Sequence, residues 1–281
     1  MGQSAVRNVT LNNGVEIPQL GFGVFQVPPA ETQAAAEAAL EAGYRHIDTA
    51  AAYQNESGVG AALRSTGVPR EEVFVTTKLR NGEQSTPRAA FDASRRALGV
   101  DVIDLYLIHW PVPSQDLYVE AWKELEGIYE RGEARTIGVS NFLPEHLDRL
   151  LAATDVIPAV NQVELHPTFQ QRETLERTRA AGIAVEAYSP LGQGRDLDAE
   201  AVASAARAHD ATPAQVVLAW HLAHGTIIIP KTTSADRMRE NLASASLELA
   251  EDEVAGIDAL DSGARIGADP ATAAFTQMPQ A

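Results

Sequence analysis

Cysteine is absent from the 281 residues of this chain. Its absence excludes disulfides, thiolate nucleophiles, iron–sulfur clusters and thiolate zinc sites, and it argues against a secreted scaffold held by disulfides. Basic residues are also scarce, since 22 Lys and Arg stand against 38 Asp and Glu and the net charge is −16. Such a surface does not attract nucleic acid or an anionic membrane without a local basic patch. We therefore expect neither nucleic acid nor a membrane as a partner.

Long apolar runs are missing as well. None approaches the roughly 20 residues that a membrane-spanning helix needs. The N-terminal segment MGQSAVRNVT lacks the apolar region of a secretion signal. Apolar residues make up 45% of the chain and charged residues 21%, which is ordinary for a soluble protein with a sizeable core. We predict a cytoplasmic protein.

Short apolar runs of strand length alternate with helical segments. Several of these segments open on a Thr-Pro pair, as at Thr86 and Thr212, or end at a glycine, as at Gly43 and Gly99. The runs are almost continuously apolar, which is typical of a parallel sheet covered by helices. Eight such units predict an α/β fold, a closed (β/α)8 TIM barrel. The strand candidates are Leu20–Phe25, His46–Thr49, Val73–Lys78, Ile103–His109, Thr136–Ser140, Ala159–Val163, Ala184–Tyr188 and Ile227–Pro230.

An N-terminal hairpin precedes the predicted barrel, at about residues 9–17, with Asn13-Gly14 as its turn. A doubly wound sheet is the alternative fold. It is disfavoured because no G-x-G-x-x-G motif follows a strand, the nearest matches being Gly21-Phe-Gly23 and Gly192-Gln-Gly194. No linker and no internal repeat divides the sequence. We predict that residues 1–281 form a single domain.

Four ionisable side chains fall at the carboxyl ends of neighbouring strands, where barrels of this kind carry their chemistry. They are Asp48, Tyr53, Lys78 and His109. Each also has a structural interpretation: a turn cap, a packed ring, a lysine stem along the barrel rim and a buried core histidine. Their convergence on adjacent strands instead favours a set of groups for proton transfer without an obvious nucleophile.

The chemistry of a phenol explains why a lysine belongs in this set. Tyrosine ionises near pH 10, so it donates protons poorly at neutral pH unless a nearby cation stabilises its phenolate. Only three of the 22 basic residues are lysines, and Lys78 is one of them. We predict that Lys78 lowers the pKa of Tyr53, while Asp48 holds the ammonium in place.

Metal binding and imine formation are the two other kinds of chemistry open to such residues. Metal binding is disfavoured, because His221 and His224 lack a nearby carboxylate trio and the pair His46 and Asp48 lacks a third ligand. We therefore predict no metal. A Schiff-base aldolase that uses Lys78 stays open, because barrel lysines do form imines, although such an enzyme has no special need for the other three residues.

At this point the ordered motifs resemble the aldo-keto reductases, from about residue 7 to about residue 270. The matching segments are Leu20-Gly-Phe-Gly23, Gly43-Tyr-Arg-His-Ile-Asp48-Thr-Ala-Ala-Ala-Tyr53, Lys78, Asp104-Leu-Tyr-Leu-Ile-His109-Trp-Pro111, Ile137-Gly-Val-Ser-Asn-Phe142 and Ile229-Pro-Lys231. Three more segments are similar to the bacterial 2,5-diketo-D-gluconate reductase branch: Ser189-Pro-Leu-Gly-Gln-Gly194, Trp220-His-Leu and the tail from Ser262 to Pro270.

The resemblance implies an NADP-dependent oxidoreductase that reduces aldehydes and ketones to alcohols by hydride transfer from NADPH. Its catalytic tetrad falls on Asp48, Tyr53, Lys78 and His109, with Tyr53 as the proton donor. Phe22 and Trp110 are expected to form apolar walls of the substrate pocket, which a C-terminal loop at about residues 261–281 completes. The small-molecule carbonyl substrate is the only partner expected, and the protein is expected to be a monomer.

The resemblance also implies where NADPH binds. The nicotinamide is expected to stack on Tyr188, with its carboxamide held by Ser140, Asn141 and Gln162. A basic cluster follows the eighth strand although the chain as a whole is acidic, which favours a site for the extra phosphate of NADP. The alternative is that Arg237 pairs with Glu240. The remaining expected cofactor residues are Ser189, Leu191, Gln193, Lys231, Thr232, Thr233, Ser234, Arg237, Glu240 and Asn241.

Three features depart from relatives in this branch: Arg80 and Tyr188 stand where Trp often occurs, and the tail is rich in alanine. If Arg80 turns toward the pocket, anionic carbonyls such as keto acids should be favoured. A non-catalytic barrel that senses dinucleotides is the alternative function, against which the complete tetrad argues.

Overall fold

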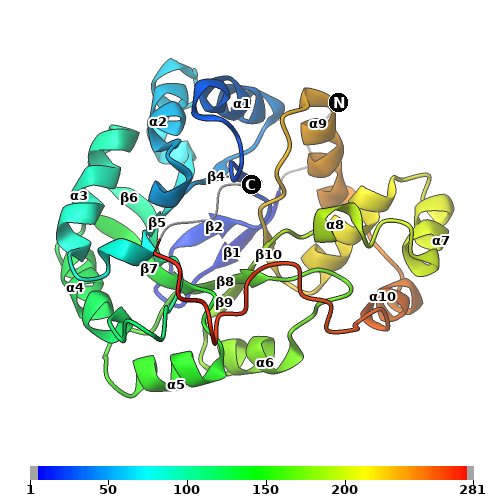
Figure 1. The fold of residues 1–281 in the computed structure, drawn as a ribbon. Coiled ribbons are helices and arrows are strands. Elements are labelled where there is room, and N and C mark those ends of the chain that lie inside the picture. Colours follow the sequence, from blue (N-terminus) through cyan, green and yellow to red (C-terminus); the bar gives the residue numbers. More distant parts are fainter. Residues whose placement is uncertain (1–5, 277–281) are drawn as a thin grey trace.

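Eight parallel strands form the centre of the molecule and helices surround them (Figure 1). The computed structural model describes residues 6–276. The sheet closes on itself because Leu20 bridges Ile228, whose carbonyl accepts a 2.7 Å hydrogen bond from the amide of Gly21. The predicted (β/α)8 barrel is confirmed. Its strands, in sheet order, are β3 (Phe22–Gly23), β4 (His46–Asp48), β5 (Phe74–Leu79), β6 (Ile103–Ile108), β7 (Ala134–Ser140), β8 (Val160–Glu164), β9 (Ala184–Tyr188) and β10 (Ile227–Ile228).

The helices begin and end largely where the sequence predicts. Gly43 and Gly99 adopt left-handed conformations (φ 115° and 68°) at the ends of the first and third helices. Thr212 forms a capping box with Gln215, whereas Thr86 makes no side-chain cap. The helices are α1 (Pro29–Ala42), α2 (Glu56–Ser65), α3 (Pro87–Leu98), α4 (Tyr118–Glu130), α5 (Pro144–Leu151), α6 (Arg172–Ala180), α7 (Glu200–Ala208), α8 (Pro213–Ala223), α9 (Ala235–Ala243) and α10 (Glu251–Asp258).

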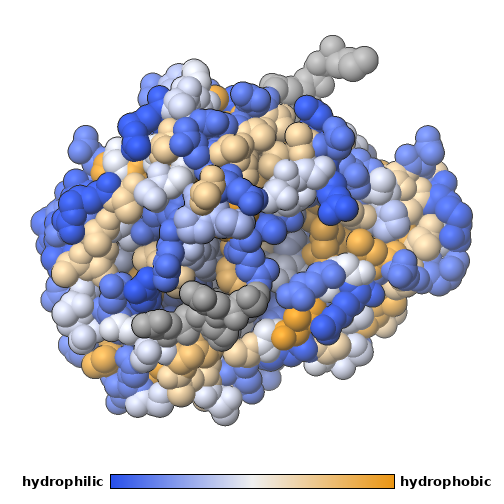
Figure 2. All heavy atoms as spheres, turned by 45° about the horizontal axis from the view of Figure 1, so that its top comes forward, coloured by the Kyte–Doolittle hydropathy of each residue, from blue (hydrophilic) through white to orange (hydrophobic). Residues whose placement is uncertain are grey.

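Figure 2 draws one face of the molecule. On it, hydrophilic side chains lie between apolar areas. Among residues 6–276, no helix is both long enough and apolar enough to cross a membrane.

The hairpin closes the amino-terminal end of the barrel. Its strands β1 (Asn8–Thr10) and β2 (Glu16–Pro18) pair antiparallel, which confirms the predicted hairpin. The hairpin contributes two buried side chains, Leu11 and Ile17. They pack in one apolar cluster with barrel residues that include Leu105, Leu107 and Val160. Because apolar side chains fill this end, the polar groups that point into the barrel lie nearer its carboxyl end.

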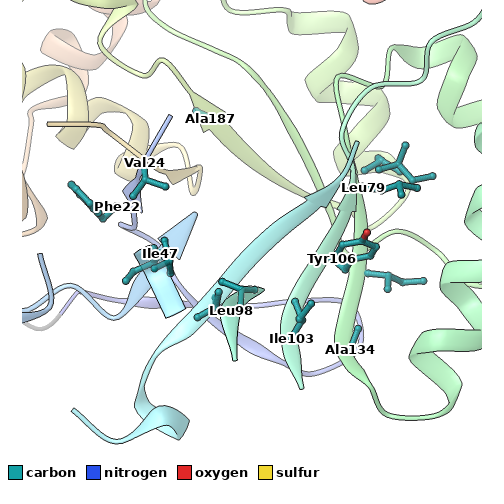
Figure 3. Close-up of a cluster of buried hydrophobic side chains, with 14 of the residues drawn as sticks. Phe22, Val24, Ile47, Leu79, Leu98, Ile103, Tyr106, Ala134 and Ala187 are labelled. Atoms are coloured by element: carbon teal, nitrogen blue, oxygen red, sulfur yellow. The ribbon is translucent and has the colours of Figure 1, made fainter. Parts of the chain in front are cut away.

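A second apolar layer lies between the strands and the helices. Phe22, Ile47, Leu79 and Tyr106 belong to this layer, and Figure 3 shows them together with other buried residues of the same cluster. Side chains alternate across a strand, so an outward residue such as Ile47 is flanked by inward residues, here His46 and Asp48. The barrel interior can therefore hold polar groups while its outer surface remains apolar.

Helices α2 and α3 pack so closely that the contact requires a glycine. A Cβ atom on Gly60 would lie 2.7 Å from the carbonyl carbon of Leu98 and 2.9 Å from the carbonyl oxygen of Ala97. We expect Gly60→Ala to lower the free energy of unfolding by about 1–3 kcal/mol, because backbone must move. This loss exceeds the gain of up to about 1 kcal/mol that alanine brings to a helix.

Urea denaturation checks this prediction. Gly67→Ala is the control, since no atom lies within 4 Å of the position of its added Cβ. Equal midpoints for the two variants would contradict the close contact between the helices.

Candidate active site

A buried ion pair lies at the carboxyl end of the barrel. Lys78, on β5, is fully buried, and its Nζ donates to Oδ1 and Oδ2 of Asp48 at 2.6 and 2.8 Å. The same Nζ donates to the carbonyl oxygen of Thr49 at 2.9 Å. Burial raises the pKa of Asp48, and the Lys78 ammonium opposes this effect. The pair therefore fixes a cation at a defined point below the barrel mouth.

Tyr53 lies directly above this cation. Its hydroxyl oxygen is 3.5 Å from Lys78 Nζ. The phenol is carried by a short 3-10 turn (Ala51–Tyr53), and the Arg80 guanidinium donates to the carbonyl oxygen of Ala51 at 3.2 Å. Arg80 is thus engaged with the turn that carries Tyr53, and it is not among the residues that line the cavity. This arrangement removes the geometric basis for a preference of Arg80 for keto acids.

The pKa of Tyr53 moves opposite to the sequence-based prediction. Burial raises the pKa of Tyr53 well above 10, and the carboxyl groups of Asp48 and Glu186 raise it further. Lys78 does not lower it below the ordinary value in the free protein, since the ammonium is bound by both oxygens of Asp48. The phenol consequently keeps its proton at neutral pH, which a proton donor must do.

His109 is the second polar ring beside Tyr53. The two ring centroids are 5.7 Å apart in an edge-to-face arrangement. Burial lowers the pKa of His109 well below its usual value, and the charge of Lys78 lowers it further. His109 is therefore neutral at pH 7, so it can donate or accept a hydrogen bond without adding a charge. The structure brings all four predicted tetrad residues together.

A cavity of about 430 Å³ opens above these groups. Its walls include Asp48, Tyr53 and His109, and the apolar residues Phe25, Trp110, Ile229, Ile266 and Phe275. Trp110 packs against Phe275 with ring centroids 5.1 Å apart. A carbonyl compound in this space would meet the phenol and the imidazole at its polar end and aromatic rings elsewhere.

The structure corrects the prediction for Phe22. This side chain is fully buried outside the barrel, where it packs on Tyr44 with ring centroids 5.6 Å apart. Because side chains alternate along a strand, the glycines on either side of Phe22 take the inward positions. The neighbouring aromatic residue that lines the cavity is Phe25.

A connected set of polar groups forms the wall opposite the aromatic rings. Tyr188 donates its hydroxyl to Asn141 Oδ1 at 2.8 Å, and Asn141 Nδ2 donates to Ser140 Oγ and to the carbonyl oxygen of His109, both at 3.0 Å. Asn141 is left-handed (φ 63°), which Asn tolerates better than most residues. The expected cofactor residues that line the cavity are Ser140, Asn141, Gln162, Tyr188, Ser189, Gln193 and Lys231.

The segment after Lys231 leads from the cavity to the first turn of α9. Ser234 caps this helix by accepting a hydrogen bond from the amide of Arg237. Glu240 accepts from Thr212 at 2.6 Å, and no ion pair between Arg237 and Glu240 is formed in residues 6–276. Expected cofactor residues that do not line the cavity are Leu191, Thr232, Thr233, Ser234, Arg237, Glu240 and Asn241.

The residues present suit a dinucleotide such as NADPH. An exposed arginine at a capped helix N-terminus is a common way to hold a phosphate. A tyrosine ring with amide groups beside it can hold a flat ring that carries a carboxamide. Among residues 6–276, no group of three or more His, Asp or Glu side chains is arranged to hold a metal ion.

A C-terminal segment forms one side of the cavity and is anchored to β8. Glu164 accepts hydrogen bonds from the amides of Ile266 and Gly267, at 2.6 and 2.7 Å. His166 lies between two carboxylates, with Nε2 3.2 Å from Glu164 and Nδ1 2.9 Å from Asp196. Burial opposes charge on His166, but the hydrogen bonds to Asp196 and Glu164 outweigh it and raise the pKa of His166. Residues 277–281 of the predicted pocket loop lie outside the described residues.

The sequence analysis assigned no role to Glu164 and did not find its partners His166 and Asp196. It also missed Glu186, a fully buried carboxyl on β9 that accepts a 2.8 Å hydrogen bond from Gln162. The available signal was a charged residue in the middle of the otherwise apolar run Ala184–Tyr188. Side-chain alternation places Glu186 on the inward face, together with Tyr188.

Comparison with known proteins gives one consistent result. The model of the aldo/keto reductase family matches residues 19–262. An aldo-keto reductase of Mycolicibacterium smegmatis is 48% identical over 270 residues, which cover 95% of this chain and 98% of the relative. A methylglyoxal reductase DkgA of Yersinia pestis is 47% identical over 264 residues, covering 93% and 95%.

Solved structures agree with the sequence comparison. A complex of a Gox0644 mutant with NADPH has a TM-score of 0.93 and 44% identity, and the match covers 96% of this chain and 100% of that chain. These matches agree with the sequence motifs, with the barrel fold and with the arrangement of the four polar residues. The chain belongs to the aldo-keto reductase family.

Proposed function

We propose that this protein reduces aldehydes and ketones to alcohols with NADPH, and that Tyr53 supplies the proton. One observation carries the proposal: a protonated phenol stands 3.5 Å from a buried ammonium, at the floor of a cavity with mainly apolar walls. Bound NADPH supplies the hydride. The remaining chemistry falls to the chain, which must bind the carbonyl compound, orient its oxygen and protonate that oxygen.

Each tetrad residue has a defined part in this chemistry. Tyr53 donates its proton to the oxygen that becomes negative as the carbonyl is reduced. Lys78 stabilises the phenolate that remains, and Asp48 holds Lys78 at the distance that this requires. Neutral His109 orients the carbonyl oxygen by a hydrogen bond. Protonation of the oxygen and stabilisation of the phenolate thus occur side by side, next to the buried Lys78.

The alternative functions have less support. A Schiff-base lysine must lose its proton to attack a carbonyl, whereas three oxygen atoms bind the Lys78 ammonium. A barrel that only senses dinucleotides has no need of a proton donor beside an apolar cavity. Incubation with NADPH and a reactive aldehyde, followed by the absorbance of the reduced nicotinamide, distinguishes turnover from binding alone.

We extend the proposal to the residues that bind the cofactor and to the location and oligomeric state of the protein. Ser140, Asn141, Gln162 and Tyr188 would hold the nicotinamide, and the segment from Lys231 to Asn241 would hold the adenosine phosphate. Phe25 and Trp110 would favour carbonyl compounds with apolar surface. We also propose that residues 1–281 act as one domain and that the protein is a cytoplasmic monomer.

Replacement of Tyr53 by Phe keeps the ring and removes the proton donor. We expect kcat to fall by about 10²–10⁴-fold, the usual contribution of general acid catalysis, with the Kd of NADPH nearly unchanged. Steady-state rates and a fluorescence titration of NADPH measure the two quantities. A variant that keeps more than about a tenth of kcat would remove Tyr53 from the mechanism.

Replacement of Arg237 by Ala should weaken NADPH and spare NADH, because only NADPH carries the additional phosphate. A hydrogen bond to a charged group contributes about 1.5–3 kcal/mol, so the Kd of NADPH should rise roughly 10- to 100-fold. Arg239→Ala is the matched control on the same helix, since Arg239 pairs with Asp236 at 2.8 Å. Equal effects of the two substitutions, or an equal loss of NADH, would contradict the phosphate assignment.

Replacement of Glu164 by Ala should loosen the C-terminal wall of the cavity. Two backbone amides, those of Ile266 and Gly267, lose a charged acceptor, each bond contributing about 1.5–3 kcal/mol. We expect KM for an apolar aldehyde to rise at least about tenfold, with a smaller rise for Glu164→Gln, which keeps one acceptor oxygen. Steady-state kinetics measure this, and an unchanged KM in the Ala variant would contradict the anchoring role.

A further inference from the structure

The polar groups inside the barrel contain one more carboxyl than the proposed chemistry uses. Glu186, from β9, is fully buried, and so is Lys78. Asp48 is 2% exposed. Asp48 lies on β4 and Gln162 on β8, and these strands are not neighbours in the sheet. The hydrogen bond between Gln162 and Asp48 therefore crosses the barrel interior.

Gln162 links the two carboxyl groups. Its Nε2 donates to Asp48 Oδ2 and to Glu186 Oε2, both at 2.8 Å. Both amide hydrogens are used in this way, so the amide cannot flip without turning its oxygen toward two carboxyl groups. Gln162 also lines the cavity. Its remaining polar atom, Oε1, is thus the one left to accept a hydrogen bond from a bound molecule.

The charges around Glu186 do not balance if both carboxyls are ionised. Lys78 directs its ammonium to Asp48, at 2.6 and 2.8 Å. The nearest ring nitrogen to Glu186 is His46 Nε2, at 3.6 Å from Oε1. Burial lowers the pKa of His46 to about 3, so this ring is neutral. A single cation therefore faces two buried carboxyls, and Glu186 Oε1 has no hydrogen-bond partner among the described residues.

The arrangement of lowest free energy keeps one proton on the pair of carboxyl groups, Asp48 and Glu186. Asp48 has the direct contact with the ammonium, so the negative charge belongs there and the proton belongs on Glu186. Burial and the neighbouring charge of Asp48 raise the pKa of Glu186 to about 8. Below that pH the buried set carries no net charge, since Asp48 balances Lys78.

We propose that Glu186 is a protonated positioning residue, which fixes the amide of Gln162 toward the nicotinamide of the cofactor and does not compete with Asp48 for Lys78. The inference rests on the proposed site for the cofactor. Glu186 is not a catalytic residue, because it acts through Gln162. When it ionises, it repels Asp48, competes for Lys78 and puts a second negative charge near Tyr53.

The first test measures protein stability and needs neither cofactor nor turnover. The unfolded chain releases the proton of Glu186 near pH 4.5, whereas the folded protein keeps it until about pH 8. Because the folded state binds more protons in this interval, wild-type stability falls as pH rises from 5 to 8 relative to E186Q. We expect the difference in Tm between E186Q and wild type to grow across this range and to level off above it.

Two comparisons make the stability test specific. Glu248→Gln replaces an exposed carboxyl and should show no growing difference. A difference between E186Q and wild type that stays constant from pH 5 to 8 would overturn the proposal, because Glu186 would then ionise at the same pH in both states.

The second test follows the Kd of NADPH in wild type, so it holds even if a variant fails to fold. Ionisation of Glu186 should raise this Kd roughly tenfold or more between pH 7 and pH 9.5, and E186Q should lack the rise. A flat wild-type profile overturns the proposal. Neither test depends on reduction of a carbonyl, so a failure of the proposed reaction is distinguishable from a failure of this inference.

Discussion

The buried contact between Lys78 and Asp48 is the interaction on which the rest of the site depends. Burying two charges is expensive, and their attraction compensates only when the geometry is good and the remaining donors are bound. Here both carboxylate oxygens and the Thr49 carbonyl accept from one ammonium. Burial and the nearby carboxyl groups raise the pKa of Tyr53, so the phenol keeps its proton beside this ammonium. The ammonium is bound by Asp48, so the second carboxyl, Glu186, has no cation of its own.

The barrel makes such a contact possible because it closes one end and opens the other. The hairpin residues Leu11 and Ile17 fill the amino-terminal end with apolar side chains, which leaves inward positions near the carboxyl end for polar ones. Strands that are not adjacent in the sheet then face each other across the interior, as β4 and β8 do through Asp48 and Gln162. A flat sheet would hold the same residues on one face without bringing them together.

The limits of sequence reasoning follow from the same geometry. The eight strands and the positions of Tyr53, Lys78 and His109 were predictable, because strand ends and periodicity are local features. The orientation of Phe22 was not recognised, although the glycines beside it indicated which face is inward. The pKa of Tyr53 was out of reach, since it depends on burial and on contacts between strands far apart in the chain. Gln162, the partner of Glu186, lies on the neighbouring strand β8, but the register that places the two side chains together is not contained in either segment alone.

Strand β8 connects the two halves of the proposed reaction. Gln162 and Glu164 are two residues apart, so both point into the barrel. Gln162 donates hydrogen bonds to the buried carboxyl groups and belongs to the polar wall proposed for the nicotinamide. Glu164 accepts hydrogen bonds from the amides of Ile266 and Gly267, in the C-terminal wall of the cavity. The short spacing along one rigid strand sets the distance between these two anchors. The hydride donor and the carbonyl carbon would be aligned by this strand more directly than by the loops that cover them.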